Sequence, residues 1–145
     1  MSVIFRFSLS PEGRPLIVKA PVDQEDEKMI EKKIVLAAFN GEMMCFAHVL
    51  LNALDMAGKG FDVKIVIEGK ATGLLPKLID EKAPFSSLFR EVLDSGLIDC
   101  ACRACSVQTN AVGAARTLGI ELAGDMEGHP SLSAYIYSGY EIITF

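Results

Sequence analysis

The feature that most constrains the fold of this chain is an alternation of short apolar runs with helical patterns, which begins at Lys33. Ile34–Phe39 is a continuous apolar run, typical of a parallel strand that is buried on both faces of a sheet. Asn40 and Gly41 interrupt that run, and Asn40 is a suitable N-cap for a helix that we expect to extend to about Ala57. Strands that alternate with helices predict an α/β fold, in which helices cover both faces of a mainly parallel sheet.

The remaining segments continue this alternation to the end of the sequence. Further strands are predicted at Phe61–Ile67, Leu97–Ala101, Ile120–Ala123 and Tyr140–Phe145. Helical segments are predicted at Ala71–Ile79, at Ser87–Asp94 with Ser86 as its cap, at Val107–Leu118, and from Pro130 to about Gly139. Together these segments predict a three-layer α/β/α arrangement, although one sequence does not determine the order of the strands.

The first 32 residues follow a different pattern. Val3–Leu9 and Pro15–Lys19 flank the sequence Pro11-Glu12-Gly13-Arg14, and this arrangement predicts a β-hairpin. Pro21–Lys33 contains five acids and three lysines, so we expect a solvated connector or a short exposed helix. We therefore expect one domain over 1–145, with the hairpin and acidic connector over 1–32 and the α/β core over 33–145.

Composition and charge exclude several classes of protein. Half of the 145 residues are apolar, which is too many for a disordered chain, and the length is sufficient for a core without disulfides or metals. The net charge of −5 argues against binding to nucleic acid or to an anionic membrane, because no basic field attracts phosphates. Arg6 interrupts the apolar N-terminal stretch, so we expect no signal peptide there, and Met43–Ala57 is shorter than the ~20 residues of a spanning helix. We expect a cytoplasmic protein with reduced thiols.

The predicted helix after the first core strand is apolar on more than one side. Its polar residues form a single narrow stripe of His48, Asn52, Asp55 and Lys59. A surface helix of a monomer needs only one apolar face. We therefore expect a homo-oligomer packed through this helix, and the alternative is that another helix of the same chain covers it.

Three of the four cysteines lie where the third core strand is predicted to end and a helix to begin. In open α/β sheets, ligands bind at this carboxyl edge. Alternation places Cys100 and Cys102 on the same side of the strand, with Cys100 deeper in the core and Cys102 emerging at the edge. Cys105 falls at or just before the first turn of the next helix. Unpaired N–H groups of that helix and the adjacent Arg103 favour a thiolate, so we expect a lowered thiol pKa and an exposed nucleophilic cysteine with a second thiol nearby.

Other residues are predicted at the same edge of the sheet. Six residues at the strand ends or in the flanking helices are candidates for lining a pocket there: Asn40, Gly41, Cys45, Glu68, Gly69 and Ser106. Core packing remains the alternative for Cys45, which falls in the first turn of its helix.

The cysteine cluster also allows other interpretations. A Cys-x-x-Cys motif occurs in thioredoxin-like dithiols, but here it follows the third strand and the chain has no tryptophan, so that assignment is disfavoured. Three thiols with His129 would supply four zinc ligands, although structural zinc sites usually draw on two separated ligand pairs. We expect no resident metal and no cofactor. A purely structural role is the remaining alternative for the cysteine cluster. The alternative for His48 is a solvated or interface position, and the alternative for His129 is a position at the start of a helix.

From Lys33 to Phe145 the sequence resembles the DsrE/DsrF-like family of small sulfur-relay proteins, in the YchN-like superfamily. The resemblance rests on the strand followed by Asn40-Gly41, the long apolar helix that ends in Ala57-Gly58-Lys59-Gly60 before Phe61-Asp62-Val63, Cys102 three residues before Cys105-Ser106, and the closing Ser138-Gly139-Tyr140-Glu141-Ile142-Ile143.

This resemblance implies a five-stranded parallel sheet, assembly into trimers or hexamers, and transfer of persulfide sulfur between cytosolic proteins. The family's acceptor cysteine lies at the end of a strand, which corresponds to Cys102, whereas Cys105 stands where many relatives have serine or threonine. The expected function is a sulfur carrier or sulfurtransferase whose partners are sulfur-donor and sulfur-acceptor proteins. The alternative is a non-catalytic, oligomeric binding or regulatory protein that holds a small anion or a thiolate-bound metal.

Overall fold

The structure, a computed structural model, describes residues 8–9, 15–16 and 32–145. The chain divides into two compact units, Met1–Ile30 and Glu31–Phe145. In the first unit, β1 (Ser8–Leu9) pairs antiparallel with β2 (Pro15–Leu16). The rest of the predicted hairpin and the acidic connector up to residue 31 lie outside the described residues, and Lys33, at the end of the predicted connector, is the first residue of the core sheet.

The second unit contains a five-stranded sheet in which every neighbouring pair of strands is parallel. Its strand order is β6-β5-β4-β3-β7. The strands are β3 (Lys33–Ala38), β4 (Asp62–Ile67), β5 (Ile98–Cys102), β6 (Leu122–Ala123) and β7 (Glu141–Thr144). The sheet confirms the predicted α/β class, and its central strands are the continuous apolar runs of the sequence, as expected for strands covered on both faces.

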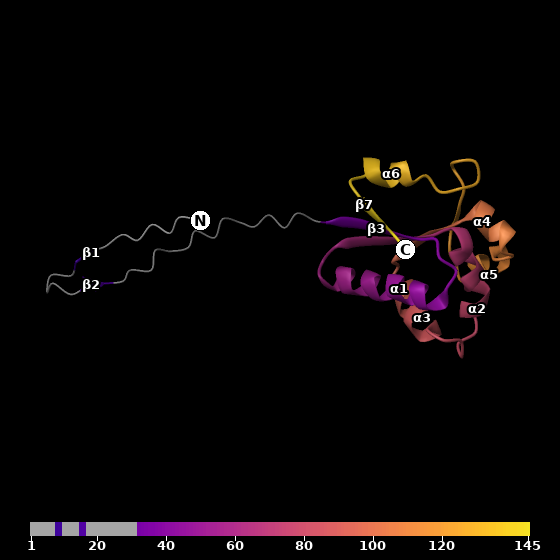
Figure 1. The fold of residues 1–145 in the computed structure, drawn as a ribbon, viewed down its shortest axis with the longest axis horizontal. Coiled ribbons are helices and arrows are strands. Elements are labelled where there is room, and N and C mark those ends of the chain that lie inside the picture. Colours follow the sequence, from indigo (N-terminus) through magenta and orange to yellow (C-terminus); the bar gives the residue numbers. More distant parts are fainter. Residues whose placement is uncertain (1–7, 10–14, 17–31) are drawn as a thin grey trace. The chain divides into compact units, whose positions relative to one another are not determined.

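Helices and one 3-10 helix connect these strands. They are α1 (Met43–Gly58), η1 (Gly69–Leu74), α2 (Leu75–Leu78), α3 (Ser86–Asp94), α4 (Arg103–Gln108), α5 (Val112–Thr117) and α6 (Leu132–Tyr137). Figure 1 shows α1 and α3 on one side of the sheet and α6 on the other. None of the helices in residues 32–145 combines the length and the apolarity needed to cross a membrane.

The two faces of the sheet bury different amounts of apolar surface. On the face of α1 and α3, alternate residues of the strands join the larger core, in which the Phe46 and Phe89 rings lie 6.4 Å apart. On the opposite face, a small cluster is formed by Val35, Val66 and Cys100. Tyr135 of α6 and the neighbouring Tyr140 pack against that cluster, together with Ala123 and Ile142 from the edge strands.

Two predicted caps differ from the observed helix starts. Asn40 is not the N-cap of α1, because its side-chain oxygen accepts the Glu42 N–H at 2.9 Å and the helix begins only at Met43. Ser86 is the first residue of α3 rather than its cap, and its hydroxyl donates to the Glu81 carbonyl oxygen at 2.6 Å. In both cases a local side-chain bond to the loop replaces the expected bond to the helix.

The helix predicted at Val107–Leu118 is in fact two helices, α4 and α5. Asn110 interrupts them with a φ of 56°, in the left-handed region. The Ala111 N–H reaches the Ser106 carbonyl oxygen at 2.7 Å and the Asn110 N–H reaches the Val107 carbonyl oxygen at 3.3 Å, which is a Schellman end with asparagine in place of glycine. As α4 begins at Arg103, Cys105 lies within its first turn.

The apolar surface of α1 is partly covered within the chain, because α3 packs against it. The residues of α1 that remain exposed form a stripe of Met44, His48, Leu51, Asp55 and Gly58. Met44 is 69% exposed and Leu51 is 51% exposed. The homo-oligomer predicted from this helix stays a prediction.

Candidate functional site

Four side chains with metal-binding or nucleophilic atoms converge at the carboxyl edge of the sheet. We name them the edge cluster: Glu68, Cys102, Cys105 and His129. One ligand atom of each lies within 4.8 Å of those of the others. Glu68 follows β4, the two cysteines span the junction of β5 and α4, and His129 belongs to the loop between β6 and α6. The strand order explains the convergence, because β5 lies between β4 and β6.

The two thiols and the imidazole of the edge cluster are in direct contact. His129 Nδ1 lies 3.2 Å from Cys102 Sγ and 3.8 Å from Cys105 Sγ. Cys102 is the N-cap of α4, and its sulfur accepts the Cys105 N–H at 3.3 Å. An N-cap side chain normally accepts an N–H two or three residues later, so the Cys-x-x-Cys spacing brings the second thiol next to the first.

The loop that carries His129 is anchored on the first turn of α4. The Ala104 N–H donates to the Gly128 carbonyl oxygen at 2.9 Å, and Met126 and His129 exchange two backbone hydrogen bonds of 2.9 Å. Gly128 has a φ of 93°, and a Cβ there would lie 3.2 Å from the Ala104 Cβ. This close approach requires glycine and fixes the backbone next to the imidazole.

Burial dominates the electrostatics of the edge cluster. Cys102 is completely buried, and burial together with its hydrogen bond to the Cys105 side chain raises the pKa of its thiol to about 12. Glu68 is only 6% exposed, and burial raises the pKa of its carboxyl while the nearby His129 opposes that shift. Glu68 Oε1 and Ser106 Oγ are the buried side-chain oxygens within residues 32–145 that have no hydrogen-bond partner.

A cavity of about 340 Å³ opens beside the edge cluster. It is lined by Gly69, Lys70, Ala104, Cys105, Gln108, Thr109 and His129. Cys102 and Glu68 do not line it, so Cys105 and His129 are the members of the cluster that face the cavity. A second cavity of about 350 Å³ shares Lys70 and Thr109 with the first and is lined also by Asn40, Gly41, Glu42, Gly73, Leu74 and Lys77.

The predicted reactive residues lie close together, but their environments differ from those expected. Cys102 is buried rather than exposed, and its thiol pKa is raised rather than lowered, because β6 and the Gly128–His129 loop cover the end of β5. Arg103 forms its hydrogen bond away from the edge cluster. Its guanidinium donates to the Gly124 carbonyl oxygen at 3.1 Å, on the exposed side of the loop.

The structure separates the predicted pocket residues into three groups. Asn40, Gly41 and Gly69 line the cavities, and Glu68 belongs to the edge cluster. Ser106, on α4, is buried and lines neither cavity. Cys45, on α1, also lines neither of the two.

Sequence reasoning did not identify all residues of the site. His129 was considered as a zinc ligand or at a helix start, and only the tight Gly128-His129-Pro130 sequence marks it as a loop residue held in place. Lys70, Gln108 and Thr109 were missed, because a 3-10 helix after β4 and a helix break at Asn110 bring them to the cavity.

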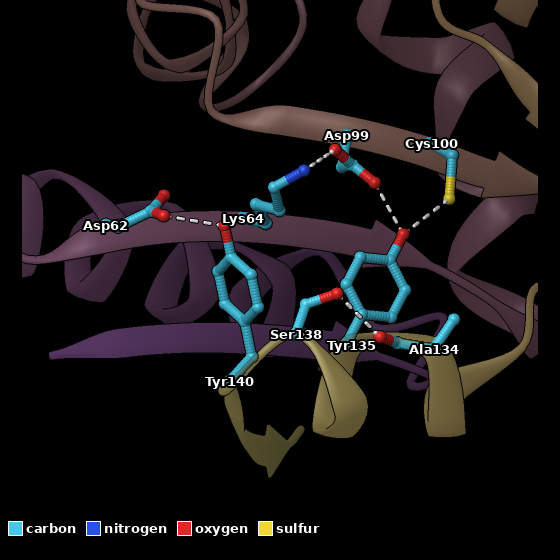
Figure 2. Close-up of polar contacts among 8 residues, drawn as sticks. All are labelled: Asp62, Lys64, Asp99, Cys100, Ala134, Tyr135, Ser138 and Tyr140. Atoms are coloured by element: carbon cyan, nitrogen blue, oxygen red, sulfur yellow. Dashed lines mark hydrogen bonds and ion pairs between the residues drawn. The ribbon is translucent and has the colours of Figure 1, made fainter.

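A second polar group lies on the α6 side of the sheet, and we name it the tyrosine network: Asp62, Lys64, Asp99, Cys100, Tyr135 and Tyr140 (Figure 2). Asp99 accepts hydrogen bonds from Lys64 Nζ at 2.6 Å and from the Tyr135 hydroxyl. The Tyr140 hydroxyl donates to Asp62 at 2.6 Å, and the Tyr135 hydroxyl lies 3.6 Å from Cys100 Sγ. A shift of register between β4 and β5 accompanies this network, with Ile65 opposite Ile98 and Val66 opposite Cys100, so that Asp99 is the extra residue.

Comparison with known proteins identifies relatives of this chain. No protein-family model matches it. An uncharacterized protein of Methanocaldococcus jannaschii is 35% identical over 101 residues, which is 70% of this chain and 80% of that protein. The chain belongs to the family of this archaeal protein. An uncharacterized protein of Archaeoglobus fulgidus is 39% identical over 44 residues, which is 30% of this chain and 72% of that protein.

A solved structure has the same fold. It is a conserved protein of unknown function from Bacteroides thetaiotaomicron, similar with a TM-score of 0.56 at 20% identity, over 79% of this chain and 95% of that one. At this identity the likeness supports the α/β fold alone.

Proposed function

We propose that this protein is a sulfur carrier of the DsrE/DsrF-like kind, which accepts persulfide sulfur at the Cys102–Cys105 pair and passes it to another protein. The observation that supports this proposal is the arrangement of the two thiols. Cys105 faces an open cavity, Cys102 lies directly behind it, and one imidazole nitrogen contacts both sulfurs. This arrangement favours Cys105 as the thiol that meets the donor, and Cys102 as the thiol that resolves the loaded state. The two roles are thus the reverse of those that the family resemblance implies, because Cys102 is buried and does not line the cavity.

Loading begins at Cys105. His129 Nδ1, 3.8 Å from Cys105 Sγ, is close enough to accept the thiol proton. The Cys105 thiolate then attacks the outer sulfur of a donor persulfide, R–S–SH, and the donor S–S bond breaks. The donor leaves as the thiolate R–S⁻, and the outer sulfur keeps its proton in the product Cys105–S–SH. Sulfur is transferred without an external oxidant.

Unloading follows one of two balanced routes. An acceptor thiolate that attacks the outer sulfur regenerates the Cys105 thiolate and leaves with the persulfide. Without an acceptor, a Cys102 thiolate attacks the inner sulfur of Cys105–S–SH, which forms a Cys102–Cys105 disulfide and releases HS⁻. Burial raises the pKa of Cys102 to about 12, so this second route is slow at neutral pH and the loaded carrier persists.

Lys70 supports the same chemistry from the wall of both cavities. A persulfide and its leaving thiolate carry negative charge, and an exposed ammonium favours the approach of such anions. Lys70 therefore takes the place that the sequence assigned to Arg103, whose guanidinium binds the Gly124 carbonyl.

The proposal is tested by mass spectrometry of the reduced, metal-free full chain after incubation with a persulfide donor. We expect an adduct of about 32 Da, one sulfur, that is lost in Cys105→Ser and retained in Cys45→Ser. In Cys102→Ser the adduct forms but no disulfide follows. An adduct at wild-type level in Cys105→Ser would contradict the proposal.

We also propose that the carrier acts in the cytoplasm as a trimer or hexamer assembled through α1. The observation in support is the exposure of Met44 and Leu51 on the outer stripe of that helix. Light scattering of the full chain measures the assembly, and Leu51→Glu is expected to reduce its mass. A wild-type protein with the mass of a monomer would contradict this part of the proposal.

A further inference from the structure

We infer that the edge cluster is a binding site for one divalent transition-metal ion of the zinc class. Its ligands are a Glu68 carboxylate oxygen, the Cys102 and Cys105 thiolates, and His129 Nδ1. The inference does not depend on sulfur transfer, because it concerns the same thiols in the absence of a persulfide donor.

The spacing of the four ligand atoms fits a tetrahedral ion. Zinc binds thiolate sulfur at ~2.3 Å and imidazole nitrogen at ~2.0–2.1 Å, so the two ligand atoms lie roughly 3.5 Å apart in a tetrahedral site. The observed distances from His129 Nδ1, 3.2 Å to Cys102 Sγ and 3.8 Å to Cys105 Sγ, lie on either side of that value. With all four atoms within 4.8 Å of one another, only small side-chain movements are needed to close the site.

Glu68 supplies an independent indication of a ligand. The side chain is 94% buried, and its Oε1 has no hydrogen-bond partner among the described residues. Buried polar atoms are nearly always paired, and a desolvated carboxylate without a partner is costly. A bound cation in contact with this oxygen satisfies it, and the same ion compensates two desolvated thiolates.

The donor set selects the class of metal. Thiolate and imidazole ligands favour zinc and similar borderline ions, whereas magnesium and calcium require oxygen ligands. A thiol that binds the metal releases its proton to solvent, so burial of Cys102 does not prevent it from acting as a ligand. Cys105 and His129 line the open cavity, which gives an ion a path to the buried ligands.

In this arrangement a bound metal ion and a donor persulfide compete for the same atom, the Cys105 sulfur. Coordination withdraws electron density from the Cys105 thiolate and so lowers its nucleophilicity toward a donor persulfide. The metal-bound protein is therefore a closed state in which the thiols are protected, and removal of the ion opens the site to a sulfur donor.

The test uses the full chain, reduced and stripped of metal under anaerobic conditions, with Co²⁺ as the probe. We expect one Co²⁺ per chain, with the thiolate-to-metal charge-transfer band and the ligand-field bands of a tetrahedral ion, and displacement by one equivalent of Zn²⁺. Circular dichroism of each variant confirms that the fold is retained.

Variants identify the ligands. Cys102→Ser and His129→Ala are expected to abolish the tetrahedral spectrum, and Glu68→Gln to weaken Zn²⁺ binding by at least about tenfold. Cys45→Ser is the matched thiol control, since Cys45 lines neither cavity, and its spectrum and affinity are expected to equal those of the wild type. Absence of the tetrahedral bands in the wild type, or an unchanged affinity in Glu68→Gln, would overturn the four-ligand site.

The two proposals fail separately. Metal binding is measured without a persulfide donor, and sulfur loading is measured in the presence of a chelator. Stoichiometric Zn²⁺ without any sulfur adduct supports the metal site and contradicts the carrier. An adduct in a protein that gives no Co²⁺ spectrum contradicts the metal site and supports the carrier.

Discussion

Two polar groups lie close to the same strands, yet they are built in opposite ways. In the tyrosine network, Asp99 accepts from both Lys64 and Tyr135. In the edge cluster, a buried carboxylate oxygen of Glu68 has no partner among the described residues, and two thiols lie against a single imidazole nitrogen. Hydrogen-bonded polar groups stabilise a fold, whereas an unpaired buried group costs free energy and requires a specific explanation, such as a ligand that completes it.

The cysteines of β5 show this difference within three residues. Cys100 lies 3.6 Å from the Tyr135 hydroxyl, and burial raises its pKa to about 11, so it remains a neutral thiol within the core (Figure 2). Cys102, two residues later, lies against His129 and Cys105 at the edge. The position along the strand, rather than the residue type, therefore distinguishes the structural thiol from the candidate ligand.

Asp99→Ala is expected to have the largest effect on stability, a loss of about 2 kcal/mol in the free energy of unfolding. The substitution leaves the Tyr135 hydroxyl and the Lys64 ammonium without their acceptor, and Asp99 is only 28% exposed in its ion pair. Urea-induced unfolding of metal-free protein measures the change.

Asp55→Ala is the matched control, because Asp55 forms an ion pair with Lys59 in which the side chains are 59% and 64% exposed. We expect a loss below about 0.5 kcal/mol there. Equal losses in Asp99→Ala and Asp55→Ala would mean that the tyrosine network contributes no more than a surface pair.

Tyr135→Phe is expected to cost about 1 kcal/mol at neutral pH, by removing the hydroxyl that bonds to Asp99. Burial and the bond to Asp99 raise the pKa of Tyr135, so the folded protein keeps the phenol protonated where the unfolded chain has released its proton. The advantage of the wild type is therefore complete below the ordinary tyrosine pKa of about 10 and declines as the pH rises above it. Urea unfolding of both proteins at pH 7 and above pH 10 measures this, and a difference that grows with pH would contradict it.

The fold was largely predictable because its central strands are buried on both faces. Such strands are continuous apolar runs, and Ile34–Phe39 and Phe61–Ile67 match β3 and β4 within one residue at each end. The break between α4 and α5 was not predictable from hydrophobic spacing. It depends on one left-handed residue, Asn110, and apolar residues continue at helical spacing on both sides of it.

The site was predictable only where it is local in sequence. Cys102 and Cys105 are neighbours because a helix start brings residues three apart together. Glu68 and His129 join them because β5 lies between β4 and β6. This strand order could not be deduced from one sequence. The expected exposure of Cys102 was wrong for a related reason, since the loop that covers it comes from beyond β6.

Glu68→Gln is expected to change the free energy of unfolding less than Asp99→Ala and Tyr135→Phe. The direction of the change is expected to depend on whether Zn²⁺ is bound. In metal-free protein, the substitution replaces an unpartnered buried carboxylate, so the free energy of unfolding is unchanged or higher by up to about 1 kcal/mol. With excess Zn²⁺, the wild type becomes the more stable protein, because only the native state binds the ion with all four ligands. Thermal unfolding with chelator and with Zn²⁺ measures both effects. A destabilisation of the metal-free protein as large as that of Asp99→Ala would remove the contrast between the edge cluster and the tyrosine network.

Arg103→Gln is expected to have the smallest effect, below about 0.5 kcal/mol, as for most exposed positions. Its guanidinium is held by the Gly124 carbonyl oxygen, so the rate at which Cys105 reacts with iodoacetamide is expected to match that of the wild type. If Arg103 instead stabilised the thiolate, as its position next to Cys102 suggested, the variant would react several-fold more slowly at neutral pH.

Lys70→Gln provides the opposing comparison, because Lys70 lines the cavity together with Cys105. Its loss is expected to slow the reaction of Cys105 with an anionic reagent such as iodoacetate more than the reaction with neutral iodoacetamide.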